Sequence, residues 1–576
     1  MFHSIVFLFT AMIAVVSFPL AIASERHPNV VLVITDDQGY GDIAAHGNKV
    51  IKTPNLDRLH DESVRFTQFH VDPTCAPTRS ALLTGRYSTR VGVWHTILGR
   101  SILRKNEVLL PQFFADAGYK TGMFGKWHLG DNYPYRPHDR GFQEAFYHLG
   151  GGVSQSPDYW GNNYFDDTYY RNGVPEKTTG YCTDVWFDNA IDFVKRHKNV
   201  PFFLYVATNA PHVPLNIDEK YWKPYAEKGL AEPLARFYGM IANIDENLAR
   251  FDKTLEELGL AENTIFIFMT DNGSAGNGFN AGMRGRKGTP YDGGHRVPFF
   301  IRWRNGNFGK PRDIETLTAH IDLVPTLIDV CQLQKPENVV FDGVSLLPLL
   351  HSDKQPDNRF DRAIGIEVNR DGIPQPWVRS AFLTQRWRLV NGVELYDMES
   401  DPGQNNDLAA QQPEIVTELR KRYMKRWSDV IQGAREWSRI PVGSPVTNSV
   451  RLSVHDWNGT GVPAYLDRVT DFVGNGRWAV DVERAGKYRF RLRHFPEESG
   501  LPLHATHAAL IVNEHRWEKQ IELTGSQKSV AEVIFDVDLQ AGSAWVETEL
   551  DDKTHGIYRG AFYVYIELLN ELSDTK

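Results

Sequence analysis

Short apolar runs alternate with helical stretches between residues 28 and 350. The first run, 29–35, is almost continuously apolar, which is typical of a strand covered on both faces of a sheet. Similar runs occur at 120–124, 201–208 and 264–270. An alternation of strands with helices predicts an α/β layer fold for this part of the chain.

The pattern changes after residue 360. Residues 361–437 predict a small α+β unit, with a hairpin that turns at Asn391–Gly392 and a helix that follows it. Residues 438–450 are rich in Pro and Ser and predict a linker. Residues 451–576 alternate apolar and polar positions in several runs, which predicts an antiparallel β-sandwich. We therefore expect three units, the first of which spans 24–360.

The first 23 residues are almost wholly apolar and end in Ala21-Ile22-Ala23, a small-x-small pattern before a polar residue. This predicts a secretory signal peptide at residues 1–23 that is removed from the mature protein. Because this stretch lacks Lys and Arg, a retained membrane anchor is the alternative. No other segment has the roughly 20 apolar residues that a membrane span needs. We expect an exported protein, periplasmic or secreted, that is not attached to a membrane after cleavage.

The composition is that of an ordinary globular protein, with 41% hydrophobic and 23% charged residues. The net charge of −9 gives no indication of nucleic-acid binding. The three cysteines, Cys75, Cys182 and Cys331, are too few for a disulfide scaffold. We interpret Cys182 and Cys331 as buried thiols, which leaves Cys75 to be explained.

Unusual polar residues follow each of the four predicted strands. The strand ends carry Asp36-Asp37, Gly125-Lys126-Trp127-His128, Asn209 to His212, and Asp271-Asn272-Gly273. Any one of these endings is also an ordinary turn signal. Because sites in open α/β sheets form beyond the carboxyl ends of the strands, their combination predicts one site at one edge of the sheet.

The oxygen atoms at these strand ends suit Ca²⁺ or Mg²⁺ better than zinc. They belong to Asp36, Asp37, Asp271 and Asn272. Carboxylates crowded together without a cation would repel one another, which favours a bound metal ion. The alternative is that these acids are separate turn residues that do not meet. Basic residues that could join them are Arg79, Lys126, His128, His212 and Lys287. A metal ion with such a cationic cluster is suited to binding a tetrahedral oxyanion.

The stretch Cys75-Ala-Pro-Thr-Arg-Ser-Ala-Leu-Leu-Thr-Gly85 resembles the signature of the type I sulfatases, which belong to the alkaline-phosphatase-like superfamily. The strand-end motifs, Pro211-His212 and Lys287 with Asp292 follow in the family order, and the resemblance covers about residues 28–435. It implies an alkaline-phosphatase-like mixed sheet flanked by helices, and a sulfuric ester hydrolase. Thr78 replaces the usual serine and Asp292 stands where glutamate is common, but neither change removes a catalytic group.

The same resemblance implies that Cys75 is the precursor of formylglycine, made by a formylglycine-generating maturation enzyme. In such sulfatases the aldehyde hydrates, one hydroxyl attacks sulfur, and the other later expels the sulfate. The resemblance also implies one Ca²⁺ ion. Its ligands would be Asp36, Asp37, Asp271, Asn272 and the modified Cys75.

Roles for the basic residues follow from the resemblance as well. Arg79 and His128 would hydrogen-bond the hydrated aldehyde, and His128 would help to remove its proton. Lys126 and Lys287 would hold sulfate oxygens. His212, together with Lys287, would protonate or stabilise the leaving oxygen.

The residues that recognise the alcohol are not defined by these motifs. Segment 145–181 is rich in Tyr, Asp and Asn, which suits a sugar but also an ordinary exposed loop. The C-terminal sandwich either binds glycans or only packs against the rest. Together with export, it favours a sulfated polysaccharide as the natural substrate and small aryl sulfates as surrogates.

Two other functions compete with this hypothesis. A phosphohydrolase of the same superfamily would need a Ser or Thr nucleophile and usually two zinc ions, and Cys75 argues against it. A secreted glycan-binding protein with an inactive catalytic domain is the second alternative. The complete set of expected site residues argues against such decay.

Overall fold

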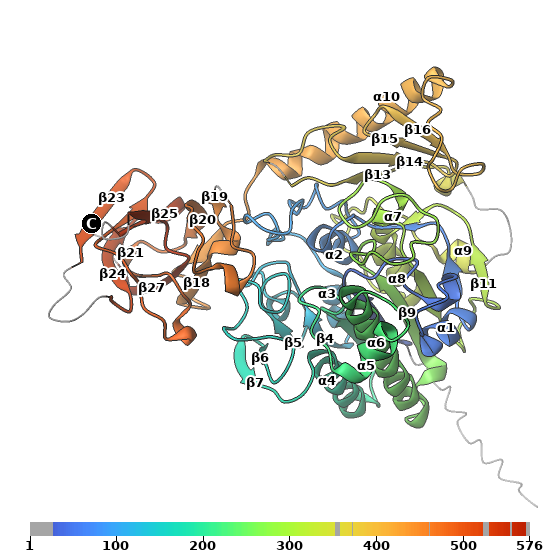
Figure 1. Cartoon of the computed structure of the whole chain (residues 1–576), viewed down its shortest axis with the longest axis horizontal. Coiled ribbons are helices and arrows are strands. Elements are labelled where there is room, and N and C mark those ends of the chain that lie inside the picture. The colour runs from blue at the N-terminus through green and yellow to red at the C-terminus, as the bar shows by residue number, and fades with distance from the viewer. Residues whose placement is uncertain are drawn as a thin grey trace, which may run out of the picture.

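The computed structural model describes residues 27–351, 358–370, 372–459, 461–521, 529–552 and 556–571. The predicted signal peptide, residues 1–23, lies outside the described residues. Figure 1 shows a large α/β body, a small unit that carries helix α10, and a β-rich C-terminal unit drawn in orange and red. Within the described ranges, no helix combines the length and the hydropathy that crossing a bilayer requires.

A ten-stranded mixed sheet forms the centre of the large body, in the order β11-β2-β10-β9-β1-β8-β4-β5-β6-β7. Strand β1 (Asn29–Thr35) runs parallel to both β8 (Phe202–Ala207) and β9 (Thr264–Thr270). Strand β4 (Lys120–Lys126) runs parallel to β8 on its other side. The four predicted strands are therefore neighbours, and their carboxyl ends meet at one edge.

Strands of both directions complete this sheet. Strand β10 is antiparallel to β9, and β6 is antiparallel to β5, so the sheet is mixed, as predicted. The outer strands are β2 (Val64–Phe66), β5 (Glu144–His148), β6 (Thr168–Arg171), β7 (Val174–Lys177), β10 (Phe299–Arg302) and β11 (Arg312–Ile314). A separate short pair joins β3 (Phe69–His70) to β12 (Thr318–Ala319).

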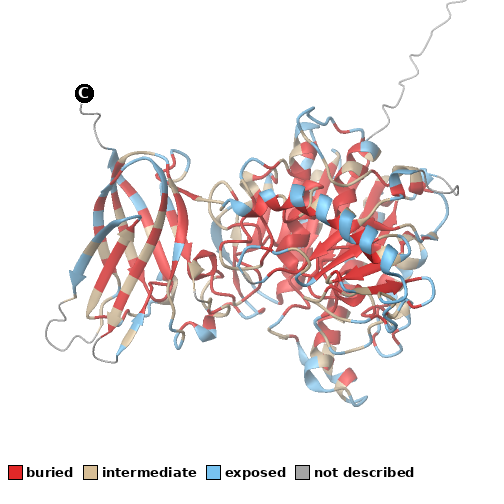
Figure 2. Ribbon diagram, turned by 90° about the horizontal axis from the view of Figure 1, so that it is seen from above, coloured by how far each residue is buried: buried red, intermediate tan, exposed pale blue. Residues whose placement is uncertain are grey.

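Helices cover both faces of the sheet. Successive side chains of a strand point to opposite faces of the sheet, so neighbouring residues of β1 belong to different hydrophobic clusters. Leu32 packs in the cluster that includes α2, α3 and α8, and Val33 packs in the cluster that includes α4 and α6. Figure 2 shows buried residues concentrated inside this body. The helices are α1 (Pro54–Asp61), α2 (Cys75–Thr84), α3 (Leu110–Asp116), α4 (Cys182–His197), α5 (Glu219–Ala226), α6 (Glu232–Glu257), α7 (Asp292–His295), α8 (Leu323–Cys331) and α9 (Leu347–His351).

The small unit has four antiparallel strands and one long helix, α10 (Pro413–Val430), whose aromatic face packs on the strands. At the predicted hairpin turn, Asn391 and Gly392 both have positive φ, of 51° and 68°, as a type I′ turn requires. The strands are β13 (Ile364–Glu367), β14 (Ser380–Leu383), β15 (Trp387–Val390) and β16 (Glu394–Asp397).

The C-terminal unit has two sheets that share one hydrophobic core, and burial alternates along its strands in Figure 2. One sheet contains β17 (Ile440–Val442), β19 (Asn458–Gly459), β20 (Gly476–Val482), β22 (His507–Val512), β23 (His515–Gln520), β25 (Gly542–Asp552) and β26 (Ile557–Arg559). The other contains β18 (Ser449–Ser453), β21 (Gly486–Arg493), β24 (Val533–Leu539) and β27 (Tyr563–Glu571).

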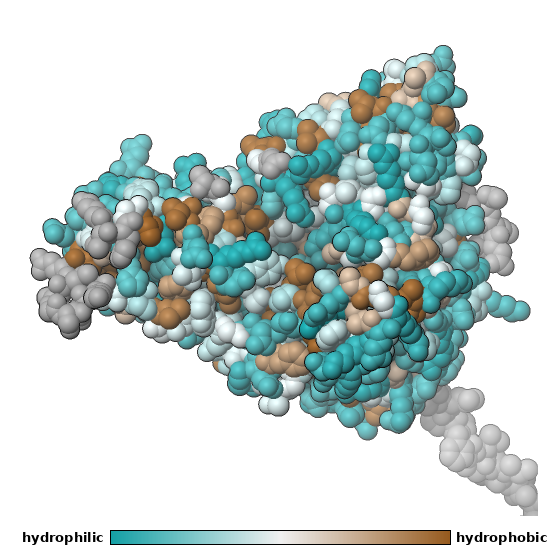
Figure 3. Space-filling view, in the orientation of Figure 1, coloured by the Kyte–Doolittle hydropathy of each residue, from teal (hydrophilic) through white to brown (hydrophobic). Residues whose placement is uncertain are grey.

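One pairing differs from the purely antiparallel pattern that the sequence predicts. Strand β17 lies inside the stretch 438–450, predicted as a linker, and it pairs in parallel with β20. The Pro-rich composition of this stretch conceals a short edge strand. The boundaries of the three units stay predictions. On the face shown in Figure 3, hydrophobic residues are scattered among hydrophilic ones.

Candidate active site

Three carboxylates lie together at the carboxyl edge of the central sheet. Asp36 and Asp37 follow β1, and Asp271 follows β9, directly beside it. All three are buried, with exposed fractions of 0%, 2% and 0%. Asp37 has a positive φ of 67°, and its backbone N–H donates to Asp271 Oδ1 over 3.1 Å. Local backbone geometry thus holds the acids together.

Each of these carboxylates has its own cation. Lys126, the last residue of β4, places Nζ 2.6 Å from Asp36 Oδ2. Lys287 Nζ donates to Asp37 Oδ1. Burial raises the pKa of Asp36. For Asp37 burial also acts to raise the pKa, but Lys287 and smaller contributions from its other neighbours together outweigh burial and lower the pKa.

Arg79 lies one turn along α2 and is fully buried. Its Nε and Nη2 donate to Asp271 Oδ2 over 3.1 and 2.8 Å, and its Nη1 donates to the carbonyl of Lys126 over 3.1 Å. Burial, together with the charge of Asp36, raises the pKa of Asp271 to about 6. Arg79 therefore ties α2 to the ends of β4 and β9.

The donor set fits a hard cation. The buried oxygens Asp36 Oδ1 and Asn272 Oδ1 have no hydrogen-bond partner. The side-chain amide nitrogen of Asn272 donates to Asp37 Oδ1 over 3.0 Å, so the amide oxygen of Asn272 points away from Asp37. Ligand atoms of Asp36, Cys75 and Asp271 all lie within 4.8 Å of one another. Because buried polar atoms are normally satisfied, these orphaned oxygens indicate a site for Ca²⁺ or Mg²⁺.

Cys75 is the first residue of α2 and is 2% exposed. Its Sγ lies 3.7 Å from Lys287 Nζ. Burial raises the pKa of the Cys75 thiol to about 11, so the thiol is protonated near neutral pH and a poor nucleophile. Cys182 and Cys331 are also buried free thiols, consistent with our interpretation of them.

Two histidines lie above the carboxylates. His128 Nε2 donates to the carbonyl of Thr96 over 2.8 Å, and its buried Nδ1 has no hydrogen-bond partner. His212 Nδ1 donates to the carbonyl of Val213 over 2.7 Å, and its Nε2 lies 3.9 Å from Asp37 Oδ2. Burial lowers the pKa of both rings, that of His212 to about 3, so both are neutral in this structure.

A pocket of about 500 Å³ opens above this cluster. The predicted site residues that line it are Asp37, Cys75, His128, His212 and Lys287. The others lie beneath its floor, where all are buried: Asp36, Arg79, Lys126, Asp271 and Asn272. Cavities of about 510 and 500 Å³ near Trp303 and His46 contain none of the predicted site residues. We therefore place the candidate site in the pocket above Cys75.

Polar residues that our sequence analysis does not predict also line this pocket. Besides Thr96 and Ser274, they are His95, Gln155, Arg286, Arg370 and Tyr465. Arg286 precedes Lys287 in a Gly-rich loop and could have been found from that position. Gln155 lies in segment 145–181, which the sequence analysis singled out as suited to a sugar. The other three carry no local signal, because only tertiary contacts bring their loops to the pocket.

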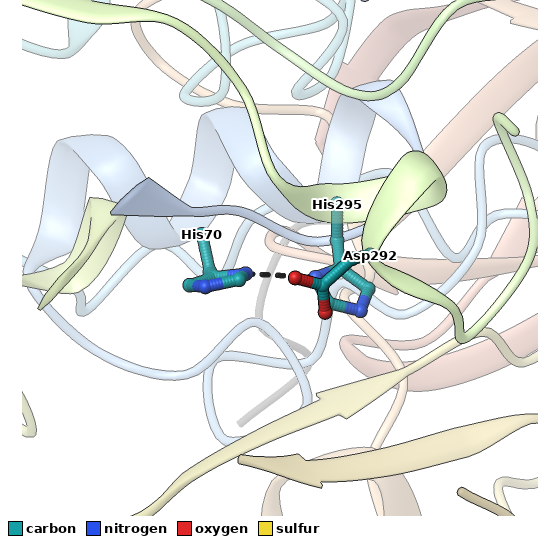
Figure 4. A group of neighbouring side chains, drawn as sticks. All are labelled: His70, Asp292 and His295. Atoms are coloured by element: carbon teal, nitrogen blue, oxygen red, sulfur yellow. Dashed lines mark hydrogen bonds between the residues drawn. The ribbon is translucent and has the colours of Figure 1, made fainter. Parts of the chain in front are cut away.

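A second group of potential metal ligands, His70, Asp292 and His295, lies beside this site (Figure 4). The Arg388 guanidinium lies 3.4 Å from His70 Nε2. His70 Nδ1 lies 3.0 Å from His295 Nδ1, and His295 Nε2 lies 3.3 Å from the carbonyl oxygen of Pro290. If each N–H donates along this chain, every ring nitrogen has a partner. Arg388 Nε also donates to Asp292 Oδ1 over 3.0 Å. Asp292 Oδ2 is buried without a hydrogen-bond partner, but the Arg388 guanidinium already balances the charge of this carboxylate, and both rings are satisfied without a metal ion.

This network holds α7 against the end of β9. Gly273 N donates to the carbonyl of Gly294 over 2.9 Å, and a Cβ added at Gly273 would lie only 1.9 Å from the oxygen of Gly293. Lys287 N in turn donates to the carbonyl of Ser274 over 3.2 Å. The network thus supports the loop that carries Lys287.

Arg388→Met should destabilise the protein by about 3–5 kcal/mol, because it leaves the Asp292 carboxylate buried without its partner. Burial alone would raise the pKa of Asp292, but Arg388, with smaller contributions from its other neighbours, outweighs burial and lowers the pKa. This lowered pKa stabilises the folded protein at pH values above the pKa of Asp292 in the unfolded chain. The stabilisation is lost as the pH falls from there toward the pKa in the folded protein. The loss measured by urea unfolding should therefore shrink below about pH 4.

The matched control is Arg386→Met, just outside the same strand. Arg386 pairs with Asp397, but its side chain is 49% exposed, so the cost should stay below about 1 kcal/mol. Equal losses for the two variants would contradict the role of the buried pair.

Comparison with known proteins identifies the family. A family model described as Sulfatase matches residues 28–333, and one for the C-terminal part of N-sulphoglucosamine sulphohydrolase matches 286–429. N-acetylgalactosamine-6-sulfatase of Mus musculus is 30% identical over 419 residues, which cover 67% of this chain and 77% of that protein. Arylsulfatase A of Homo sapiens is 30% identical over 465 residues, with coverage of 69% and 88%.

A solved structure supports the same family assignment through its fold. Ps i-CgsB in complex with k-i-k-neocarrahexaose superposes with a TM-score of 0.64 at 26% identity, covering 72% of this chain and 95% of that one. The chain belongs to the sulfatase family, has its alkaline-phosphatase-like fold, and is a sulfuric ester hydrolase.

Proposed function

We propose that this protein hydrolyses sulfate esters of carbohydrates through a formylglycine residue made from Cys75, beside one bound Ca²⁺ ion. The observation that carries the proposal is the position of Cys75. It begins helix α2 among buried carboxylates, with its Sγ and the oxygens of Asp36 and Asp271 all within 4.8 Å of one another. A nucleophile there is beside a cation site and faces the pocket.

The unmodified Cys75 thiol is a poor nucleophile because it stays protonated, and conversion to formylglycine replaces it with a better one. A hydrated formylglycine supplies one hydroxyl that attacks sulfur and a second that later expels sulfate. The oxidation requires a maturation enzyme that is separate from this chain. The start of α2 suits this nucleophile, because the positive end of the helix dipole favours negative charge.

In this proposal the carboxylates bind the metal ion and the lysines bind the sulfate group. The proposed Ca²⁺ ligands are Asp36, Asp37, Asp271, Asn272 and the modified Cys75. When bound, Ca²⁺ polarises a sulfate oxygen and favours the deprotonated hydroxyl. A cation that neutralises the acids leaves the ammonium groups of Lys126 and Lys287 available to sulfate oxygens. Lys287 is already 3.7 Å from Cys75 Sγ, within reach of a group bound there.

The remaining basic residues orient the nucleophile and handle its protons. Arg79 holds Asp271 and the Lys126 carbonyl, and so fixes the start of α2 against the sheet. His128 presents Nδ1, which has no hydrogen-bond partner, and can accept the proton of the nucleophilic group. His212 presents Nε2 and serves the leaving oxygen, after a bound sulfate ester has raised its pKa.

A carbohydrate sulfate is the substrate class that the relatives support. One relative is named N-acetylgalactosamine-6-sulfatase, and one similar structure holds k-i-k-neocarrahexaose. The pocket has aromatic and amide side chains beside its basic residues, which suits a sulfated sugar. With export directed by residues 1–23, a sulfated polysaccharide is the natural substrate and small aryl sulfates are surrogates.

Cys75→Ala should lower turnover of an aryl sulfate by at least about 10³-fold, because it removes the nucleophile. Cys331→Ala is the control, since Cys331 is a buried thiol of the hydrophobic core, and it should retain activity. Mass spectrometry of the tryptic peptide 66–79, with an aldehyde-trapping reagent, should show formylglycine. An unmodified thiol in active protein would contradict the mechanism.

Adding Ca²⁺ to chelator-treated protein should raise its thermal midpoint, with a stabilisation of about 2.7 kcal/mol at 100 times the dissociation constant. Asn272→Ala should weaken calcium binding in calorimetry at least about tenfold, because it removes a ligand oxygen. Asp188→Asn, at a side chain that is 61% exposed, is the control. Unchanged calcium binding in Asn272→Ala would contradict the ligand assignment.

His212→Ala should reduce kcat most for sulfate esters with poor leaving groups, because these need a proton on the departing oxygen. A plot of log kcat against the leaving-group pKa for substituted aryl sulfates should become steeper in the variant. A parallel line, with the same loss for every ester, would argue against the acid role.

A further inference from the structure

The C-terminal unit contributes residues to the pocket above Cys75. Ala464 and Tyr465 line this pocket, although they lie more than 30 residues beyond the matched region that ends at residue 429. Neither family model therefore covers these positions. Their presence in the pocket comes from packing of the C-terminal unit against the α/β body.

Backbone pairing fixes Tyr465 beside Gln155. The two residues form an antiparallel bridge. Ser156 N donates to the carbonyl of Ala464 over 3.0 Å, and Leu466 N donates to that of Ser154 over 2.9 Å. Backbone hydrogen bonds on both sides thus fix the position of residue 465 in the pocket wall.

Further contacts anchor the whole unit on the same loops. Tyr563 Oη donates to the carbonyl of Ser156 over 2.6 Å, and Leu98 N donates to that of His455 over 2.8 Å. The core of the sandwich also includes Ile102 of the α/β body. Figure 1 shows the C-terminal unit against this side of the body. These loops include residues that line the pocket, so the two units form its wall together.

Gln155, the residue paired with Tyr465, lies near both histidines of the pocket. A Cβ added at Gly152 would be 3.2 Å from His212 Nδ1 and 3.4 Å from Gln155 Nε2, and one added at Gly151 would be 2.5 Å from His128 Nε2 and 2.9 Å from Gln155 Oε1. Burial raises the pKa of Tyr465, while a hydrogen bond from Gln155 and the charge of Lys287 oppose the increase. Tyr465, Gln155 and His212 all line the same pocket.

We propose that Tyr465 is a specificity residue that contacts the sugar from which sulfate is removed, so that the C-terminal unit forms part of the substrate site. This inference rests on the proposed function, in which His212 marks the side of the leaving alcohol. A tyrosine ring stacks on the apolar face of a sugar, and its hydroxyl with the Gln155 amide can hydrogen-bond the sugar hydroxyls.

The test compares a sugar ester with an aryl sulfate. The sugar probes are N-acetylgalactosamine 6-sulfate and a sulfated carrageenan hexasaccharide, and the one with the higher wild-type kcat/KM is used. Tyr465→Ala should lower the ratio of kcat/KM for the sugar to that for the aryl sulfate about tenfold, a loss that matches the energy of one stacked ring. Tyr465→Phe keeps the ring and should recover most of this ratio.

The control is Tyr558→Ala in the same unit. Tyr558 is 51% exposed and lines a different cavity, so the ratio should stay within about twofold of the wild-type value. An unchanged ratio in Tyr465→Ala would overturn the inference, whether both substrates lose activity equally or neither does. Equal loss would assign Tyr465 a structural role only.

Binding to Cys75→Ala protein separates this inference from the proposed function. Calorimetry with the same sugars should show weaker binding when Tyr465→Ala is added to that background. If mature wild-type protein hydrolyses no sulfate ester but binding still depends on Tyr465, the proposed function fails and the inference holds. If aryl sulfate is hydrolysed and the sugars bind equally with and without Tyr465, the inference alone fails.

Discussion

Three carboxylates buried at one sheet edge are the constraint on which the rest of the structure depends. An unpaired charge at such a depth costs several kcal/mol, so the fold must supply a cation for each acid. The pairs are Lys126–Asp36, Lys287–Asp37 and Arg79–Asp271. Each cation comes from a different element, β4, the loop before α7, and α2. Satisfying the acids therefore also brings these elements together around Cys75.

The same constraint accounts for the buried network behind the site. Asp292 and Arg388 are both fully buried, and their pair joins the small unit to the α/β body. His70 and His295 extend this pair by hydrogen bonds to the carbonyl of Pro290, in the loop that carries Lys287. A group that has the composition of a metal site thus serves as a support, because the guanidinium already supplies the positive charge.

The pocket above the site is built by all three parts of the chain. The α/β body supplies Cys75 and most of the charged residues, the small unit supplies Arg370, and the C-terminal unit supplies Tyr465. In the function we propose, sulfate chemistry and recognition of the alcohol depend on different parts of the protein. Variation in the outer parts can change the substrate while the charged floor stays the same.

The sequence by itself determined the fold class and the strand-end residues, because both depend on local patterns. A buried parallel strand needs an apolar run, and such strands end at one edge, so the pattern alone is enough to place Asp36, Lys126 and Asp271 together. The motif around Cys75 is a contiguous stretch, which also made it recognisable.

Only the tertiary structure decided which distant segments meet. The bridge between Gln155 and Tyr465 joins loops that are 310 residues apart, and neither loop has a pattern that indicates its partner. The short strand β17 likewise forms because β20 offers it an edge, which the composition of residues 438–450 does not reveal. Pairing between remote segments depends on the packing of whole units, whereas periodicity and strand ends are properties of a few neighbouring residues.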